Sequence, residues 1–206
     1  MPDEYASVLL AIDPVILTIR NKELCVLLKR REKEPYTGKH ELLGGRVKKE
    51  ETAEAAAARK VREIVGDAPI YLEQFHTFTE PGRDPRERSV SVAFVALVSA
   101  HALKLEGTGA WFPIGKLPAL AFDHARIIAV ARDYLRAHTD EIVVKQFLPK
   151  RFPLNELQAA YECIKGETYD NRNFRKRMLA LELVNETEEY EKGVSHRPAR
   201  LYTFAK

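Results

Sequence analysis

The chain has 206 residues and a formal net charge of +3, from 33 lysines and arginines against 30 acidic residues. This length can hold one large domain or two small ones. So small a charge excludes a global basic field, which means that any nucleic-acid site must be local. The two cysteines form no paired framework, and no apolar run is long enough to cross a membrane. We therefore expect a cytoplasmic protein with no bound metal and no cofactor.

The first half of the chain has the pattern of strands around one helix. Two β-rich runs over residues 8–28 meet near Asn21, which tolerates a positive φ, so they predict a hairpin. An Ala-rich helix is expected over 52–65, ended by Gly66. Strands are expected at 70–78 and 89–99, on either side of an arginine-rich polar loop.

A second helix completes this unit. Residues 111–113 are interpreted as a short connection, and Asp123 is expected to cap a helix that reaches Ala137. Residues 139–152 have the character of a junction. The order of elements predicts an α+β fold with a first domain over 1–140 and a second over 141–206.

The second domain has the pattern of two short helices and a hairpin. The apolar face of the first helix is made of Leu157, Ala160, Tyr161 and Ile164. A second helix is expected over 170–181, and its inward side chains are expected to be Phe174, Met178 and Leu181. Two β-like runs then flank a loop with Gly193 and Pro198. Helix, helix and hairpin is the order of a winged helix-turn-helix domain.

The segment GRVKKEETAEAAAARKVREIVGD resembles the box of the Nudix hydrolase family, whose pattern is G-x5-E-x7-R-E-U-x-E-E-x-G-U with U apolar. The matching residues are Gly45, Glu51, Arg59, Val61, Glu63 and Gly66. A Gly-Gly turn before an ordinary surface helix would not produce this joint spacing. The resemblance implies a Nudix α/β/α sandwich with a mixed sheet.

The box is damaged where the family holds its metal. In the family, three glutamates at i, i+3 and i+4 share one helix face and bind Mg²⁺ for attack on a pyrophosphate. Those positions are Lys60, Glu63 and Ile64 here, and a single carboxylate holds a hard cation poorly. We expect no pyrophosphohydrolase activity, although other carboxylates remain available to rebuild a site, namely Glu50, Glu51 and Glu54. Arg59 and Glu51 are expected to form an ion pair that fixes the loop to the helix.

A ligand site without hydrolysis remains a reasonable expectation, because a fold can keep its pocket after losing its metal ligands. The loop GRDPRER offers forked guanidinium donors that suit a diphosphate. The candidate effector-binding residues are Arg46, Glu63, Arg83, Arg86 and Arg88. An equally good interpretation of this loop is solvated surface charge. Among the histidines, His124 alone stands out, because it follows the expected cap at Asp123.

The second helix of the C-terminal domain has the composition of a recognition helix. Its outward side chains are basic or amide, and such side chains can bond to base edges in the major groove. The hairpin adds cations suited to phosphate contact. The candidate DNA-binding residues are Arg172, Asn173, Arg175, Lys176, Arg177, Lys192, His196, Arg197 and Arg200. An ordinary charged helix surface is the alternative, but both basic clusters lie where a winged helix meets DNA.

The whole pattern resembles the Nudix-related transcriptional regulator family, NrtR. The resemblance covers almost the whole chain and includes the motifs YLEQFHTF, RDPRERSVSVAF, WFPIGKLPALAFDHA, ELQAAYECIKG, DNRNFRKRML and HRPARLYTF. It implies a homodimeric repressor on palindromic double-stranded operators, which responds to ADP-ribose or a related NAD metabolite. Two alternatives stay open: an active ADP-ribose pyrophosphatase with an accessory tail, and a regulator that responds to a sugar such as arabinose.

Overall fold

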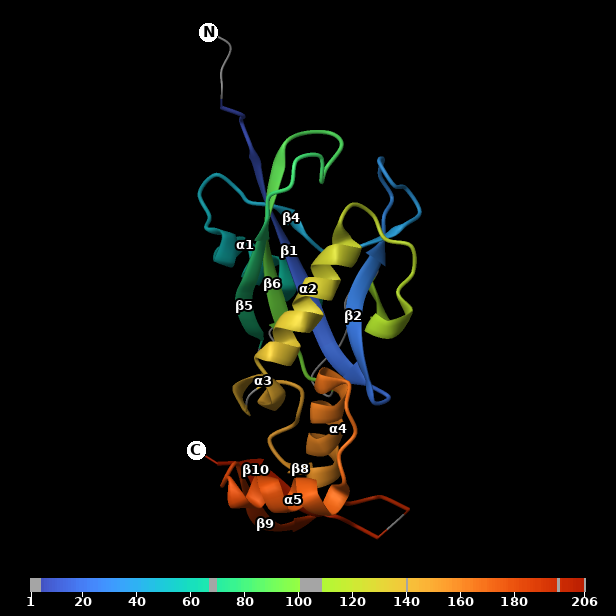
Figure 1. Ribbon diagram of the computed structural model, residues 1–206, viewed down its shortest axis with the longest axis vertical. Coiled ribbons are helices and arrows are strands. Elements are labelled where there is room, and N and C mark those ends of the chain that lie inside the picture. The colour runs from blue at the N-terminus through green and yellow to red at the C-terminus, as the bar shows by residue number, and fades with distance from the viewer. Residues whose placement is uncertain (1–4, 67–69, 101–108, 140, 196, 206) are drawn as a thin grey trace.

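The computed structural model describes residues 5–66, 70–100, 109–139, 141–195 and 197–205. A large sheet with two helices forms one end of the molecule, and a small sheet with two crossed helices forms the other (Figure 1). The strands are β1 (Leu9–Arg20), β2 (Glu23–Arg30), β3 (His40–Glu41), β4 (Gly45–Arg46), β5 (Tyr71–Phe78), β6 (Ser89–Leu97), β7 (Gly109–Pro113), β8 (Phe152–Pro153), β9 (Val184–Tyr190) and β10 (Arg200–Phe204). The helices are α1 (Ala53–Val65), a 3-10 turn (Ile114–Lys116), α2 (His124–Ala137), α3 (Glu141–Lys145), α4 (Leu154–Lys165) and α5 (Asn171–Ala180).

The large sheet is mixed, as the Nudix resemblance predicts. Its strand order is β3-β2-β1-β6-β5, with β4 paired to β1 and β7 paired to β2. β1 runs parallel to β6 and antiparallel to β2. The expected hairpin is confirmed: Arg20 pairs with Glu23, and Asn21 and Lys22 both have positive φ, as a two-residue turn between twisted strands requires.

The two faces of the sheet bury against different helices. Because successive side chains of a strand point to opposite faces, alternate residues of β1 enter different cores. Val15 and Leu17 pack in the cluster that contains α2, whereas Ile12 and Ile16 pack in the clusters that contain α1. The result is the expected α/β/α sandwich, with α2 in front of the sheet in Figure 1.

The helix of the box begins and ends as its sequence predicts, within one residue. Thr52 caps it, since its hydroxyl accepts the Ala55 N–H at 3.2 Å. Gly66 ends it with a φ of 65° that a residue with a side chain rarely adopts.

The interpretation of residues 111–113 as a connection is wrong. They lie in β7, where Phe112 pairs with Val26 and Trp111 with Leu27 of β2. The run GAWFP lacks the alternation of a half-buried strand, and its partner is distant in sequence, so no local pattern reveals the pairing.

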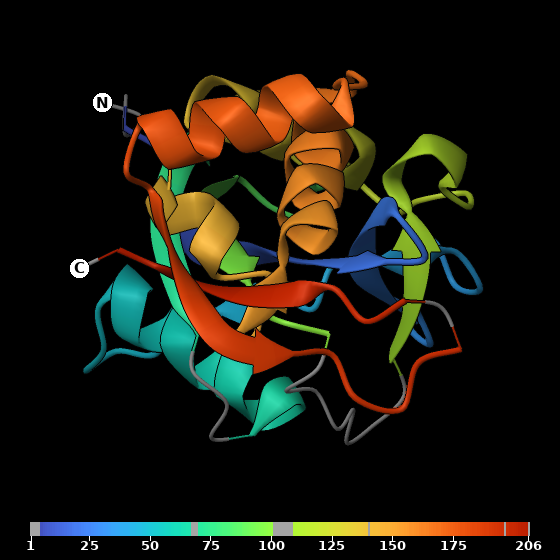
Figure 2. The same ribbon diagram turned by 90° about the horizontal axis from the view of Figure 1, so that it is seen from below.

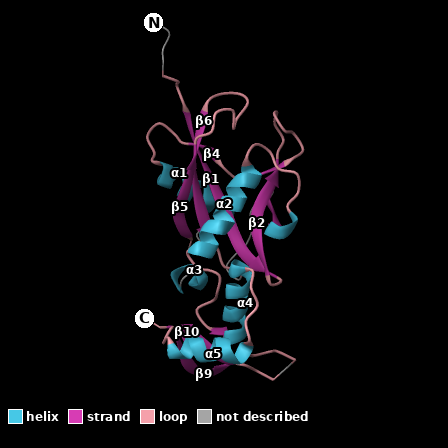
Figure 3. Ribbon diagram, viewed as in Figure 1, coloured by secondary structure: helices cyan, strands magenta, loops and turns pink. Residues whose placement is uncertain are grey.

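The C-terminal part has the expected winged-helix order. α4 and α5 lie crosswise, and the small sheet, of order β8-β10-β9, packs beside them (Figure 3). Phe174 and Met178 are buried against Leu157, Ala160 and Ile164, as predicted. Tyr161 is partly buried and contacts the Phe174 ring edge-on.

Leu181 was expected to point inward, and this expectation is wrong, because its exposed fraction is 54%. α5 ends at Ala180, and Glu182 turns the chain with a φ of 52°. The 3.6-residue period therefore no longer applies at Leu181.

The two parts share one apolar core and a polar contact. Buried residues of α2, α4 and α5 form one continuous cluster with the sheet. The Arg136 guanidinium of α2 donates to the Ile164 carbonyl of α4 at 3.3 Å, and Lys165 Nζ donates back to the Arg136 carbonyl at 2.6 Å. Within the described ranges, no helix is long and apolar enough to span a membrane.

Candidate functional site

A pocket of about 340 Å³ opens at the end of the large sheet that lies away from the small domain. It is lined by β1, by the glycine turn before the box, by the arginine loop and by the residues that lead into α2. Of the predicted effector-binding residues, Arg46, Arg83 and Arg86 line this pocket. Glu63 and Arg88 are not among its lining residues, so the structure does not bring all five together.

A buried charge cluster forms one wall of the pocket. The Arg83 guanidinium donates to both carboxylate oxygens of Asp123, at 2.9 and 2.8 Å, and to Asp13 at 3.3 Å. Its side chain is only 7% exposed. Arg83 therefore lines the pocket, but its donors are already used inside the protein.

Asp123 does not have the role predicted for it. It precedes α2, yet its carboxylate makes no capping hydrogen bond, because it accepts from Arg83 instead. Asp13 completes the cluster by accepting the Ser91 hydroxyl at 2.6 Å. Burial removes water from the Asp123 carboxylate, so its charge needs a partner inside the protein. Arg83 is that partner, and the local cap is not formed.

His124 also lines the pocket and lies beside this cluster. Its Nδ1 accepts the Leu42 N–H at 3.0 Å, and its Nε2 lies 3.7 Å from Asp13. Burial lowers the pKa of His124, while the charge of Asp13 acts in the opposite direction. The imidazole is therefore neutral, with its proton on Nε2, and it fixes the start of α2 to the chain that follows β3.

The rim of the pocket carries the exposed cations. Arg46 pairs with Glu87 at 2.6 Å, and Arg86 pairs with Asp84 through two nitrogens, at 2.9 and 2.6 Å. The Arg86 pair lowers the pKa of Asp84. The Arg46 and Arg86 side chains are 66% and 45% exposed, so water and ions reach both.

Sequence analysis missed Arg31, Glu41 and Phe122. Arg31 is nearly buried and donates to Glu41 at 2.6 Å and to the Pro35 carbonyl at 2.5 Å. The guanidinium carbons of Arg31 and Arg86 lie 4.7 and 5.4 Å from the centre of the Phe122 ring. Sequence analysis also missed Asp13, for which a signal was available: a charged residue inside an apolar strand run needs a buried partner, and that partner is Arg83.

The box helix is held by ion pairs rather than by a metal site. The expected Arg59–Glu51 pair is present, with nitrogen–oxygen distances of 2.6 and 3.1 Å, and it lowers the pKa of Glu51 to about 2. Lys60 Nζ lies 2.7 Å from Glu63, which also pairs with Arg59. In the described part of the chain, no three His, Cys, Asp or Glu side chains form a group able to hold a metal ion.

These contacts do not fit the Mg²⁺ that the Nudix fold implies. The ammonium of Lys60 neutralises Glu63, the one box carboxylate that remains at a metal position. The aliphatic part of the Lys60 side chain lies against Gly45, where an added Cβ would come within 3.0 Å of Lys60 Cε. Glu51, which was named as a substitute ligand, is fully engaged by Arg59.

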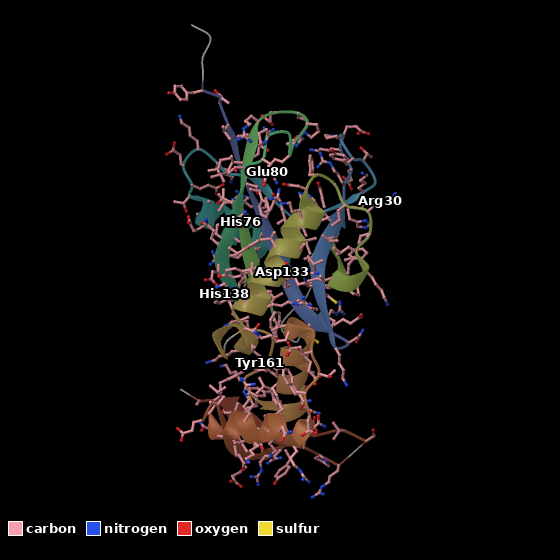
Figure 4. The ribbon with its side chains drawn as sticks, viewed as in Figure 1. Arg30, His76, Glu80, Asp133, His138 and Tyr161 are labelled. Atoms are coloured by element: carbon pink, nitrogen blue, oxygen red, sulfur yellow. The ribbon has the colours of Figure 1, made fainter. Side chains whose placement is uncertain are left out.

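At the opposite end of the molecule, α5 presents its polar side chains to solvent (Figure 4). All five predicted residues of this helix are exposed: Arg172, Asn173, Arg175, Lys176 and Arg177. Asp170 caps the helix by accepting the Asn173 N–H at 2.9 Å. Among the described residues, Arg172, Lys176 and Arg177 have no ion-pair partner, whereas Arg175 pairs with Glu186.

The hairpin brings further cations to the same end. Lys192 and Arg197 are exposed, and Arg200 lies on β10. His196, also predicted to contact DNA, lies outside the described residues.

The turn between α4 and α5 is fixed by polar contacts that sequence analysis did not find. Gln158 Nε2 donates to the Tyr169 carbonyl and to Asn171 Oδ1, both at 2.8 Å. Glu162 accepts the Tyr169 N–H at 2.9 Å, and Gly166 provides the left-handed residue that ends α4. These contacts set the angle at which α5 is presented.

Comparison with known proteins agrees with this two-part structure. The model of the NUDIX domain family matches residues 11–131, and the model of the NrtR DNA-binding winged helix domain matches residues 144–204. The chain is 32% identical to the "ADPR responsive transcriptional repressor NtrR" of Acinetobacter baylyi, over 98% of this chain and 84% of that protein. It is also 33% identical to an ADP-ribose pyrophosphatase of Methanocaldococcus jannaschii, over 64% of this chain and 76% of that protein.

Solved structures of NrtR from Shewanella oneidensis are similar along the chain. The structure in complex with a 27mer DNA superposes with a TM-score of 0.82 at 30% identity, covering 95% of this chain and 93% of that one. The NUDIX domain of the same protein in complex with ADP ribose gives a TM-score of 0.57 at 33% identity, covering 66% and 93%.

The fold and the basic helix therefore define a transcriptional regulator in which a winged helix is joined to a Nudix domain. Within that class, this chain belongs to the NrtR family.

Proposed function

We propose that this chain is a cytoplasmic, homodimeric repressor whose winged helix, within the domain proposed at 141–206, binds a palindromic operator. Its Nudix domain, over 1–140, binds ADP-ribose or a related NAD metabolite without hydrolysing it. The observation that carries the proposal is the separation of two candidate sites at opposite ends of one apolar core. A polar pocket with exposed arginines lies at one end, and a helix with free outward cations lies at the other.

DNA binding rests on the outward face of α5. Arg172, Lys176 and Arg177 are exposed and make no ion pair with the described residues, so they are free to bind bases or phosphates. The Acinetobacter and Shewanella relatives support this role, since one is named a repressor and the other was solved with DNA.

Two substitutions test the role of α5. Arg172→Ala should cost roughly 1–3 kcal/mol on the operator and relax the preference at one base pair, because a bidentate contact to guanine is lost. Arg177→Ala should instead weaken binding to every duplex and reduce the salt slope by about one, as loss of a phosphate contact requires. Fluorescence anisotropy at several salt concentrations measures both. If neither variant changes affinity for any duplex, α5 is not a recognition helix.

The effector site rests on the pocket at the end of the large sheet. Arg46 and Arg86 are exposed, and each pairs with one acidic side chain. The Arg46–Glu87 pair is exposed on both sides and contributes little, whereas Asp84 is only 11% exposed. A diphosphate can therefore replace Glu87 or Asp84 as the acceptor of their hydrogen bonds. The Shewanella NUDIX domain complexed with ADP ribose supports this ligand class.

A thermal-shift screen against ADP-ribose, NAD, nicotinamide mononucleotide and pentoses tests the effector, because a ligand of the folded state stabilises it. Titration of operator affinity then tests the coupling. By reciprocity, the effector must change operator affinity by the same factor by which the operator changes effector affinity. If ADP-ribose binds and operator affinity stays unchanged, ADP-ribose is not the regulatory ligand and the sugar alternative gains support.

Absence of hydrolysis rests on the Lys60–Glu63 pair, which places a cation beside the one remaining metal-position carboxylate. The similarity to the Methanocaldococcus ADP-ribose pyrophosphatase is the observation that favours the alternative function, hydrolysis of ADP-ribose. Assay of ADP-ribose cleavage with Mg²⁺ separates the two, since turnover of even about one per second is an ordinary enzymatic rate and would establish an enzyme. Lys60→Glu with Ile64→Glu is the matched gain-of-function variant. Activity in that variant alone would assign the loss to the box.

A further inference from the structure

One carboxylate lies among the cations of the winged helix. Glu186 of β9 uses both of its oxygens: Oε1 accepts the Tyr202 hydroxyl at 3.1 Å and Arg175 Nη2 at 3.3 Å, and Oε2 accepts from Arg200 Nη1. The hydrogen bond from Tyr202, followed by that from Arg200, lowers the pKa of Glu186, so it is ionised at neutral pH. A single acidic side chain therefore joins an arginine of α5 to an arginine of β10.

These residues line a groove of about 680 Å³ between the helix pair and the hairpin. Arg197 adds a third guanidinium to the groove. Figure 2, seen from below, shows α5 on one side and the β9–β10 hairpin on the other. Guanidinium groups in a fixed array suit the oxygens of a phosphodiester. The groove therefore has the chemistry of a DNA-backbone site, but two of its three cations already have an internal partner.

The internal pairs are exchangeable. The side chains of Arg175, Glu186 and Arg200 are 55%, 39% and 34% exposed, so water and salt weaken their attraction. A phosphate can displace the carboxylate from either arginine, but the displaced Glu186 then stays beside the negatively charged backbone. Each duplex that enters the groove meets this repulsion, whatever its sequence.

We propose that Glu186 is a positioning residue that limits sequence-independent binding by holding Arg175 and Arg200 within the groove. This inference rests on the proposed DNA-binding function. Non-specific binding depends almost wholly on phosphate contacts, so it loses most from occupied arginines. Specific binding also uses the relative placement of α5 and the hairpin, which Glu186 supports by linking the two. The carboxylate thereby increases the ratio of specific to non-specific affinity.

Glu186→Gln tests the proposal against a matched control. The amide keeps an acceptor for Tyr202 and removes the charge that holds both arginines. Glu188 lies two residues along the same strand, is exposed, and has no side-chain partner among the described residues. Glu188→Gln therefore removes an equal charge without releasing an arginine. Anisotropy titrations would use the full chain with a random-sequence duplex and with the tightest duplex selected by the wild type from a randomised pool.

We expect Glu186→Gln to bind the random duplex roughly three- to ten-fold more tightly than Glu188→Gln does, with a salt slope steeper by about one. Affinity for the selected duplex should rise less, so the specificity ratio falls. Equal behaviour of the two variants overturns the inference and leaves the proposed function intact. A wild type that binds no duplex even at low salt overturns both.

A double-mutant cycle with Arg175→Ala distinguishes release of an arginine from general loosening of the domain. If Glu186 acts through Arg175, then Arg175→Ala should weaken random-duplex binding more in the Glu186→Gln background than in the wild type. Additive effects contradict the proposal. Should Glu186→Gln fail to fold by circular dichroism, Glu186→Asp is compared with Glu188→Asp, because both variants keep the charge and only the first draws a carboxylate away from the two arginines. Equal random-duplex affinity of these two variants also contradicts the proposal.

Discussion

Two arginine–carboxylate clusters lie at opposite ends of this molecule. At the pocket of the large sheet, Arg83 joins Asp13 and Asp123, and all three side chains are at most 17% exposed. At the winged-helix end, Glu186 joins Arg175 and Arg200, and all three are at least 34% exposed. Each cluster joins different elements of the fold through similar arginine–carboxylate hydrogen bonds. The difference that matters here is how far each cluster is exposed to water.

That difference decides what each cluster can do. A buried ion pair contributes little net energy when intact, but removing one partner leaves an uncompensated charge in a medium of low dielectric constant. An exposed pair is screened, so its members can exchange partners at small cost. The buried cluster therefore fixes the wall of the pocket, and the exposed one is suited to releasing its arginines to a ligand.

Arg83→Ala should produce the largest effect on stability. Removal of this side chain leaves Asp13 and Asp123 buried and without their cation, which should lower the free energy of unfolding by about 3–5 kcal/mol. Urea denaturation measures the change. Asp123→Asn alone and in combination with Arg83→Ala completes a cycle, and the double variant should lose less than the sum of the two. A loss below about 1 kcal/mol for Arg83→Ala would mean that the cluster behaves as a surface pair.

The buried cluster also marks the limit of what the sequence could predict. The box spacing and the 3.6-residue periods depend on neighbours along the chain, and they correctly indicated the sandwich, α1 and the winged helix. Asp123 was expected to cap α2 because that too is a local rule, but its partner Arg83 lies 40 residues away. Strand β7 was missed for the same reason, since its pairing with β2 joins distant segments.

The candidate sites show the same limit: local sequence predicts which residue types are present, but not which of them pair with each other. Composition located the arginine loop and the basic helix, so the kinds of side chain at each site were predictable. Which arginines are free was not, because that depends on contacts made in three dimensions. Arg83 has its donors occupied by Asp13 and Asp123, whereas Arg172 has no ion-pair partner among the described residues.

His124 should make the free energy of unfolding depend on pH. Its pKa in the folded protein lies below the ordinary value of 6.5, so between the two values the unfolded chain binds the extra proton. Stability from this group is therefore complete above about pH 6.5 and falls as the pH decreases, by at most about 1.4 kcal/mol per pH unit. Urea denaturation from about pH 7.5 to pH 5 measures this slope and stays above the range in which carboxylates such as Glu51 begin to titrate.

His124→Asn is the control for that slope. The amide oxygen can accept the Leu42 N–H in place of Nδ1 but takes up no proton in this range. The variant should show a flatter dependence of stability on pH than the wild type. Equal slopes in the two proteins would assign the dependence to other groups.

Arg86→Ala should have the smallest effect on stability and thereby sharpen the contrast with Arg83. Arg86 lines the same pocket but is 45% exposed, and its partner Asp84, although only 11% exposed, still accepts the backbone N–H of residue 86 at 3.0 Å when the guanidinium is removed. The free energy of unfolding should change by less than about 1 kcal/mol. Affinity for ADP-ribose should nevertheless fall roughly ten-fold or more, because a charge-assisted hydrogen bond to a phosphate is lost. Denaturation together with calorimetric titration gives both quantities on one sample. A variant that loses stability as Arg83→Ala does, or that binds ADP-ribose unchanged, would show that position on the rim does not determine which arginine serves the ligand.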